Sequence, residues 1–242
     1  MTPGRQGGGG YLAQTGAADT SLTLARLMTW LSPAFPVGGF SYSHGLEWMV
    51  ETGKAKDAAM LGDWIEDILV HGAGRTDAIF LAEAWRAVSA GDATSLSEVT
   101  ELAAAFVPSA ERRLETLAQG AAFVAAIKAV WPHPVIDRLS TQEEIAYPVA
   151  VGACSAAHNL PLAETAQAFV QGFAANLVSA GVRLIPLGQT DGLRVIARLE
   201  PLLPRVVASA LGASLDDIGG IAVMADIASM RHETQYTRLF RS

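Results

Sequence analysis

The chain has a single cysteine, few aromatic residues and no basic cluster, and these shortages exclude several classes of protein. Cys154 has no partner for an intramolecular disulfide, so a cytoplasmic location is expected. The 24 Asp and Glu residues outnumber the 17 Lys and Arg residues. Because a nucleic-acid binder usually carries a basic patch, the sequence predicts no nucleic-acid partner.

Long apolar runs and strand-like alternation are absent as well. No apolar run reaches the roughly 18 residues that a membrane-spanning helix requires, so no membrane association is expected. The N-terminus lacks the apolar segment of a secretory signal, and its glycine run predicts a flexible tail over residues 1–20. No stretch alternates polar with β-branched residues, so no β-sheet is predicted.

The sequence is instead rich in alanine and leucine at helical spacing. Hydrophobic residues make up 50% of the 242 positions, and alanine, the strongest helix former, is prominent among them. Apolar positions recur three and four residues apart; one such segment follows Ser21 and another has Asp57 as its N-cap. We therefore predict one compact all-α domain of about eight to ten helices over residues 21–242.

Two interpretations fit the stretch SPAFPVGGFSYSHGLE, which joins two predicted helices. It nearly matches the nucleophile elbow G-x-S-x-G, which would make Ser41 the nucleophile and His44 the general base of a serine hydrolase. That elbow follows a strand, however, whereas a helix is predicted here. In the other interpretation Pro36 and Gly38 shape a joint, and Ser41 or Ser43 caps the second helix. We favour the joint.

Cys154 and His158 are the best candidates for metal ligands. They are four residues apart, so both would lie on one helix face, and a thiolate with an imidazole suits nickel or zinc. No H-E-x-x-H or C-x-x-C pattern accompanies them. Cys154 also lies among small apolar residues, as a buried core cysteine would. We predict no metal centre and no cofactor, with a nickel-binding pair as the alternative.

The C-terminal stretch RHETQYTRLFRS combines aromatic, aliphatic and arginine residues. Tyr, Phe and Arg are the residue types that anchor protein interfaces, whereas an idle terminus is usually polar. The stretch therefore either binds a partner or docks on its own core.

Four stretches taken together resemble one family, the urease accessory protein UreF. They are SPAFPVGGFSYSHGLE (residues 32–47), YPVAVGACSAAHNLPL (147–162), NLVSAGVRLIPLGQTDG (176–192) and HETQYTRLFRS (232–242). Their order and spacing match as well, and the resemblance covers nearly the whole chain after the glycine-rich start.

The resemblance implies an all-α protein without enzymatic activity that assists nickel delivery into apo-urease. It also implies binding to the accessory protein UreD (also called UreH) and to the GTPase UreG, and formation of a homodimer. We expect the C-terminal stretch to bind the UreD-like partner, and Tyr42 and Arg183 to lie near the dimer or GTPase-facing surface. The residues predicted to bind partners are Pro36, Gly38, Ser41, Tyr42, Gly45, Glu47, Arg183, Gln189, Asp191, Tyr236, Arg238, Leu239, Phe240, Arg241 and Ser242.

Overall fold

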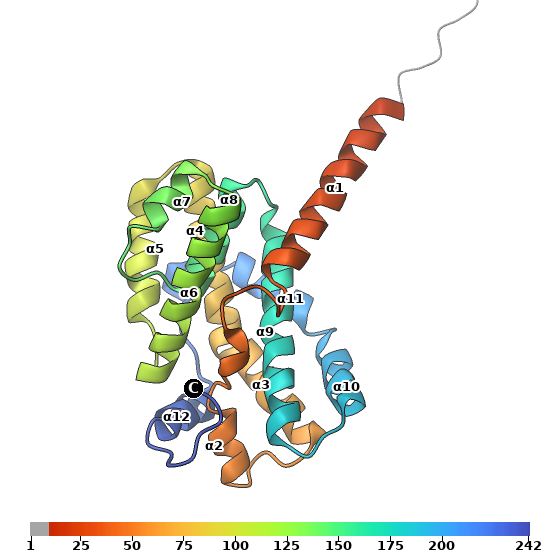
Figure 1. Ribbon diagram of the computed structural model, residues 1–242, viewed down its shortest axis with the longest axis vertical. Coiled ribbons are helices and arrows are strands. Elements are labelled where there is room, and N and C mark those ends of the chain that lie inside the picture. The colour runs from red at the N-terminus through yellow and green to blue at the C-terminus, as the bar shows by residue number, and fades with distance from the viewer. Residues whose placement is uncertain (1–9) are drawn as a thin grey trace, which may run out of the picture.

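The computed structural model describes the backbone of residues 10–242 and the side chains of residues 20–242. Every regular element in this part of the chain is a helix, which confirms the all-α prediction (Figure 1). The α-helices are α1 (Gly10–Trp30), α2 (Leu46–Glu51), α3 (Ala58–His71), α4 (Ala73–Ala90), α5 (Ala93–Ala105), α6 (Ala110–Val130), α7 (Pro134–Leu139), α8 (Tyr147–Ala157), α9 (Leu162–Leu184), α10 (Gln189–Leu199), α11 (Leu203–Leu211) and α12 (Val223–His232). Two short 3-10 turns, η1 (Gly39–Ser41) and η2 (Leu215–Asp217), complete the set.

The core forms where α8 packs between α4 and α6. Two glycines of these helices allow the close approach. A Cβ on Gly152 would lie 2.2 Å from the Leu81 carbonyl oxygen, and a Cβ on Gly120 would lie 2.0 Å from that of Ile145. Both distances are far below a van der Waals contact, so only glycine fits at these crossings.

Polar N-caps fix the start of several helices. Asp57 accepts a hydrogen bond from the Met60 N–H at 2.9 Å, as the sequence predicts, and Ser109 accepts one from the Arg112 N–H at 3.2 Å. Such caps satisfy backbone donors that have no partner within the helix. The cap at Ser109 directs the first turns of α6 toward α12, where the polar groups described below converge.

Two local features differ from the sequence-based expectations. Helix α1 begins at Gly10 rather than near Ser21, and it projects from the body of the molecule (Figure 1). A flexible tail is predicted over residues 1–20. Residues 1–9 lie outside the described residues, and the backbone of residues 10–20 belongs to α1. The short helix α7 was not expected; it starts at Pro134, which suits a first helical turn.

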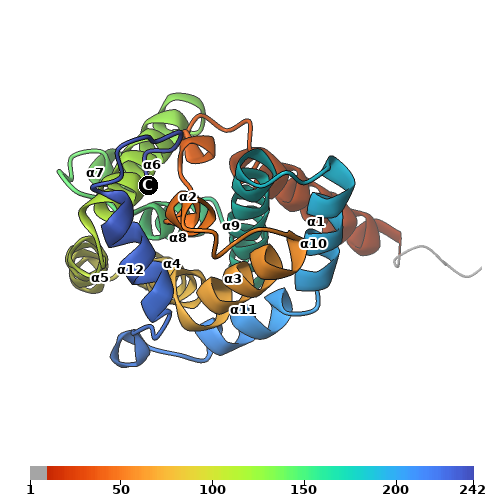
Figure 2. The same ribbon diagram turned by 90° about the horizontal axis from the view of Figure 1, so that it is seen from below.

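The C-terminus lies at the end of the molecule opposite the projecting part of α1. Figure 2, which views the molecule from below, shows it beside α2 and α6. Helix α12 packs on the same two helices. Within the described part of the chain, no helix combines the length and apolarity that crossing a membrane would need.

Candidate functional site

The joint between α1 and α2 consists of turns and the 3-10 turn η1. Gly38 and Gly45 have positive φ angles of 72° and 76°, and they are the N-cap residues of η1 and α2. A Cβ on Gly45 would lie 2.6 Å from the backbone nitrogen of Ser229, so this glycine also lets α12 approach α2. The N-cap residue of α2 is Gly45 rather than Ser41 or Ser43, although the Ser43 hydroxyl accepts the Glu47 N–H of the first turn at 3.4 Å.

The hydrolase pair is not assembled. His44 is buried, and its Nε2 lies 2.9 Å from Glu115 Oε1 and 2.6 Å from Arg112 Nη1. Burial and the Arg112 guanidinium lower the pKa of His44. Neither Ser41 nor His44 hydrogen-bonds the other among the described contacts; the Ser41 carbonyl oxygen instead accepts the Arg241 N–H at 2.8 Å.

The candidate metal ligands Cys154 and His158 also have structural surroundings. Cys154 is fully buried in the core, and this burial raises the pKa of its thiol, which disfavours the thiolate that binds metals. His158 Nε2 lies 3.1 Å from the Trp131 carbonyl oxygen, and its ring packs edge-on against Trp30. Across the described residues, no group of three or more His, Cys, Asp and Glu side chains is placed to hold a metal ion.

The C-terminal segment, residues 233–242, docks on its own core through backbone hydrogen bonds. Glu47 accepts the Leu239 N–H at 2.6 Å with one carboxylate oxygen and the Phe240 N–H at 2.8 Å with the other. The Ser43 N–H donates to the Ser242 carbonyl oxygen at 2.7 Å. The loop before α2 and the first turn of this helix therefore hold the segment, which follows a course of turns and bends.

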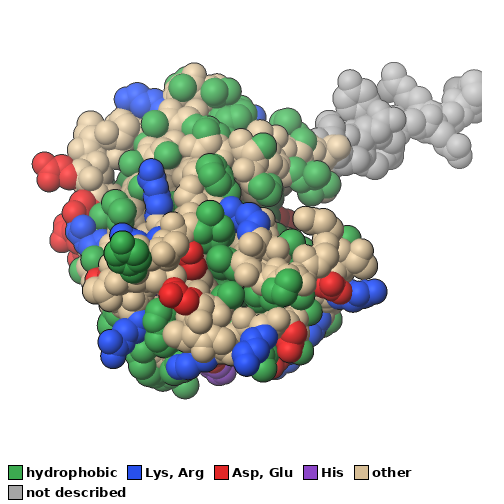
Figure 3. Space-filling view, turned by 60° about the horizontal axis from the view of Figure 1, so that its bottom comes forward, with side chains coloured by type: hydrophobic (Ala, Val, Ile, Leu, Met, Phe, Trp, Pro, Cys, Tyr) green, Lys and Arg blue, Asp and Glu red, His purple; other side chains and the backbone are tan. Residues whose placement is uncertain are grey.

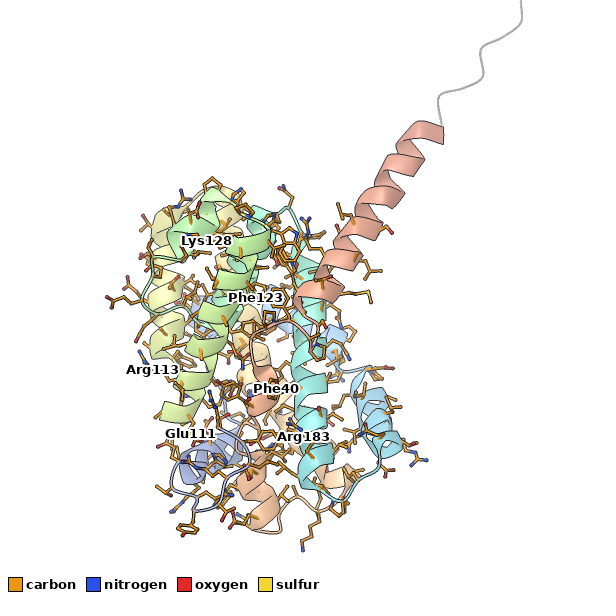
Figure 4. The ribbon with its side chains drawn as sticks, in the orientation of Figure 1. Phe40, Glu111, Arg113, Phe123, Lys128 and Arg183 are labelled. Atoms are coloured by element: carbon orange, nitrogen blue, oxygen red, sulfur yellow. The ribbon has the colours of Figure 1, made fainter. Side chains whose placement is uncertain are left out.

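Side chains add to this docking. Phe240 is only 4% exposed, and the Arg183 guanidinium lies over its ring at 4.4 Å. Arg183 also donates to the Phe40 carbonyl oxygen at 2.8 Å, and Figure 4 shows these two residues approaching each other from α9 and η1. Arg238 donates to Glu111 at 2.8 Å. The segment is thus held from both sides, by α6 and by α9.

A buried charged cluster lies beneath the segment, and sequence reasoning missed most of it. His232 is fully buried between Glu47 and Glu111. Glu115 binds Arg112 and accepts a hydrogen bond from the Ser242 hydroxyl at 2.9 Å. Burial alone would raise the pKa of Glu115, but Arg112 and His44 outweigh it and lower this pKa to about 2.

A sequence signal for this cluster exists in the first turns of α6, AERRLETLAQG. Glu111 and Glu115 are four residues apart, so they lie on one helix face, with Arg112 beside them. Charged residues on the buried side of a helix indicate a polar site, because an unpaired buried charge is very costly.

The docked segment also presents side chains to solvent. Tyr236 is fully exposed and Leu239 is 68% exposed. Arg231 and Arg241 are exposed at the same end of the chain. Figure 3, with the bottom of the molecule turned forward, shows hydrophobic side chains interspersed with Lys and Arg over this face. Exposed apolar residues beside arginines are typical of protein interfaces.

The other predicted partner-binding residues divide between exposed and buried positions. Pro36 is exposed, whereas Tyr42 is only 3% exposed and is not available to a partner in this conformation. Gln189 and Asp191 lie in the first turn of α10, where Asp191 accepts the Gly188 N–H at 3.2 Å and pairs with Arg194. Among the described contacts, none joins these two residues to the C-terminal segment.

Two cavities flank the buried charges. A cavity of about 340 Å³ lies toward α4, α5 and α12, and one of about 160 Å³ lies toward η1 and α9. His44, Asp77, Arg112 and Thr116 line both of them. Asp77 forms no hydrogen bond or ion pair among the described contacts, and burial raises its pKa to about 6.

Comparison with known proteins finds matches over most of the chain. The family model described as UreF matches residues 55–200. A curated protein of Rhodopseudomonas palustris (strain HaA2), named urease accessory protein UreF, is 57% identical over 93% of this chain and 96% of its own length. A protein of the same name from Bradyrhizobium diazoefficiens is 53% identical over 93% of this chain and 94% of its own length. Another, from Xanthobacter autotrophicus, is 49% identical over 99% of each chain. The chain belongs to the UreF family.

Proposed function

We propose that this protein is a urease accessory protein that acts as a non-catalytic adaptor in urease maturation. In this proposal it binds a UreD/UreH-like accessory protein and a UreG-like GTPase in the cytoplasm, and their complex delivers nickel to apo-urease. Family membership supports the role in urease maturation. The observation that supports an adaptor most directly is the docked C-terminal segment, which presents Tyr236 and Leu239 to solvent.

Truncation of this segment tests the adaptor role. A chain that ends at Gln235 loses Tyr236 and Leu239 but keeps His232, so Glu47 and Glu111 retain a partner. We expect the truncated chain to keep its helical circular dichroism and to lose co-purification with the UreD-like protein. A truncated chain that still binds both partners would show that the contact lies elsewhere on the molecule.

We further propose that the protein scaffolds the GTPase rather than supplying a catalytic arginine. The guanidinium of Arg183, the candidate for such a role, is engaged by the Phe240 ring and the Phe40 carbonyl oxygen. An arginine that stabilises phosphoryl transfer must instead reach the nucleotide of its partner. In single-turnover GTP hydrolysis by the UreG-like partner, Arg183→Ala should leave the rate constant within the complex unchanged. A large fall in that constant with the complex intact would identify Arg183 as a catalytic arginine.

The proposed homodimer is tested separately. Each chain has a mass of 25.4 kDa. Sedimentation equilibrium of the isolated protein should therefore report twice this mass, and the mass of a single chain over the whole concentration range would exclude the dimer.

A further inference from the structure

The contacts of His232 require more protons than a neutral histidine has. Its Nδ1 lies 2.7 Å from Glu111 Oε2, and its Nε2 lies 3.1 Å from Glu47 Oε2. A neutral imidazole has one N–H donor and one acceptor, whereas an ionised carboxylate only accepts. Each of the two contacts therefore needs its own proton, so the three residues share one proton beyond those of a neutral imidazole and two carboxylates.

Other hydrogen bonds indicate that the glutamates are the acceptors in these contacts. Glu47 accepts the backbone N–H groups of Leu239 and Phe240, and Glu111 accepts the Arg238 guanidinium. A carboxylate that accepts several N–H donors is stabilised in its ionised form. The additional proton accordingly belongs on the imidazole, and His232 is a buried cation between two anions.

His232 ends α12, which contacts α2 and α6, the helices that carry the two glutamates. Residues 233–242, which follow it, are held by Glu47, by Glu111 and by the contact of Phe240 with Arg183 of α9. Helix α12 and residues 233–242 together form the C-terminal unit. Gly219 and Gly220 precede the unit, and Gly219 has a φ angle of 149°, which suits glycine. If the unit leaves this surface, His232 leaves both glutamates. A solvent-exposed histidine loses its proton near pH 6.5.

We propose that docking of α12 and the C-terminal segment takes up one proton, held by His232 between Glu47 and Glu111, and that the unit is released as the pH rises. The sign follows from linkage: the docked state binds more protons than the undocked state above about pH 6.5, so docking weakens with increasing pH. The docking equilibrium constant should fall by up to about tenfold per pH unit. The exposed side chains of Tyr236 and Leu239 are held in place only in the docked state.

Neighbouring titratable groups do not reproduce this dependence between pH 7 and 9. On α6, Glu115 is ionised throughout, because its pKa is lowered to about 2, and Arg112 stays charged. His44, before α2, is neutral throughout, because burial and Arg112 lower its pKa. Within α12, burial raises the pKa of Asp226, so proton uptake there acts at more acid pH.

Two further charged groups belong to the docked unit itself. Arg238 stays charged, and Glu233 accepts the Ala110 N–H at 2.9 Å. An ionised glutamate at a helix N-terminus is favoured by the helix dipole. The proton taken up between pH 7 and 9 is therefore that of His232.

The first test is the protonation state of the ring in the full-length protein. Long-range ¹H–¹⁵N spectra distinguish an imidazolium, in which both nitrogens are protonated, from either neutral tautomer. We expect His232 to give imidazolium shifts at pH 7.5, which lies above the ordinary histidine pKa of about 6.5. Shifts of a neutral tautomer for His232 would overturn the proposal without any substitution.

The second test is hydrogen–deuterium exchange of peptides that cover residues 223–242, with rates corrected for the intrinsic effect of pH. The protection factor of the wild-type protein should fall from pH 7 to pH 9, by up to about tenfold per unit. In His232→Gln it should be lower at pH 7 and nearly independent of pH, because an amide can donate to one glutamate but cannot titrate.

The control His71→Gln changes an exposed histidine of α3 and should keep the wild-type slope. Protection of α4 and α8 in the same experiment reports whether each variant is folded. A flat wild-type profile, or an unchanged slope in folded His232→Gln, would contradict the proposal. The proposal concerns the isolated chain, so it stands or falls independently of partner binding.

Discussion

Replacement of Glu47 by alanine should detach the C-terminal segment while leaving the helical core intact. The carboxylate of Glu47 accepts the backbone N–H groups of Leu239 and Phe240 and pairs with His232. A hydrogen bond to a charged group contributes about 1.5–3 kcal/mol, so loss of the two backbone bonds costs about 3–6 kcal/mol if the segment stays docked. Detachment of the segment costs less free energy than this, because the N–H groups of the detached segment bind water.

The expected result is therefore local. At about 1.4 kcal/mol per factor of ten, a loss of about 3 kcal/mol lowers the protection of the Leu239 and Phe240 amides at least about 100-fold. The assay is hydrogen–deuterium exchange at a fixed pH of 7. Glu51→Ala is the matched control, because Glu51 ends the same helix and is exposed.

Two outcomes would refute this reasoning. If the C-terminal amides of Glu47→Ala kept wild-type protection, the carboxylate would not be what holds the segment. If protection fell equally in α4 and α8, the segment would be part of the global folding unit rather than a separately docked one. Glu51→Ala should leave every peptide unchanged.

Three further predictions concern the buried charges and the core. Asp77→Asn should raise the free energy of unfolding at pH 7 by about 1–3 kcal/mol, because the burial that raises the pKa of Asp77 makes its ionised form unfavourable in the native state. In chemical denaturation this gain in stability should shrink from pH 6 to pH 4, where the native carboxyl becomes protonated. Arg112→Ala should destabilise the protein by about 3–5 kcal/mol in urea melts at pH 7, because Glu115 stays buried without its cation, and the loss should diminish as the pH falls toward 2. Gly152→Ala should cost about 1–3 kcal/mol by thermal unfolding, because its Cβ would overlap the Leu81 carbonyl oxygen, whereas a fully tolerated alanine would show that α8 can shift.

The helical architecture could be predicted from the sequence because its signals are local. The spacing of Leu61, Trp64 and Ile65 defines the buried face of α3, and Asp57 caps this helix as expected, whereas Met60, also predicted on that face, is exposed. The N-cap of α2 was mispredicted, because its geometry depends on contacts that are distant in the sequence. Gly45 occupies that position, since α12 packs directly against it.

The candidate site was only partly predictable for the same reason. The C-terminal residues carry an interface-like composition, but whether they bind a partner or their own core depends on Glu47, which lies far away in the sequence. His232 was visible in the terminal stretch, yet its pairing with Glu47 and Glu111 requires three helices to meet. Periodicity cannot predict such a tertiary contact, because it reports only which face of each helix is buried.

The most direct test of the adaptor account uses exposed residues whose replacement should not disturb the fold. The double variant Tyr236→Ala/Leu239→Ala removes two solvent-facing side chains of the docked segment, and Val130→Ala removes one of comparable exposure to Leu239 at the far end of α6. In co-purification with the UreD-like and UreG-like partners, the account predicts that the double variant loses the UreD-like protein while Val130→Ala retains both. Retention of both partners by the folded double variant would contradict the claim that the C-terminal segment is the docking surface.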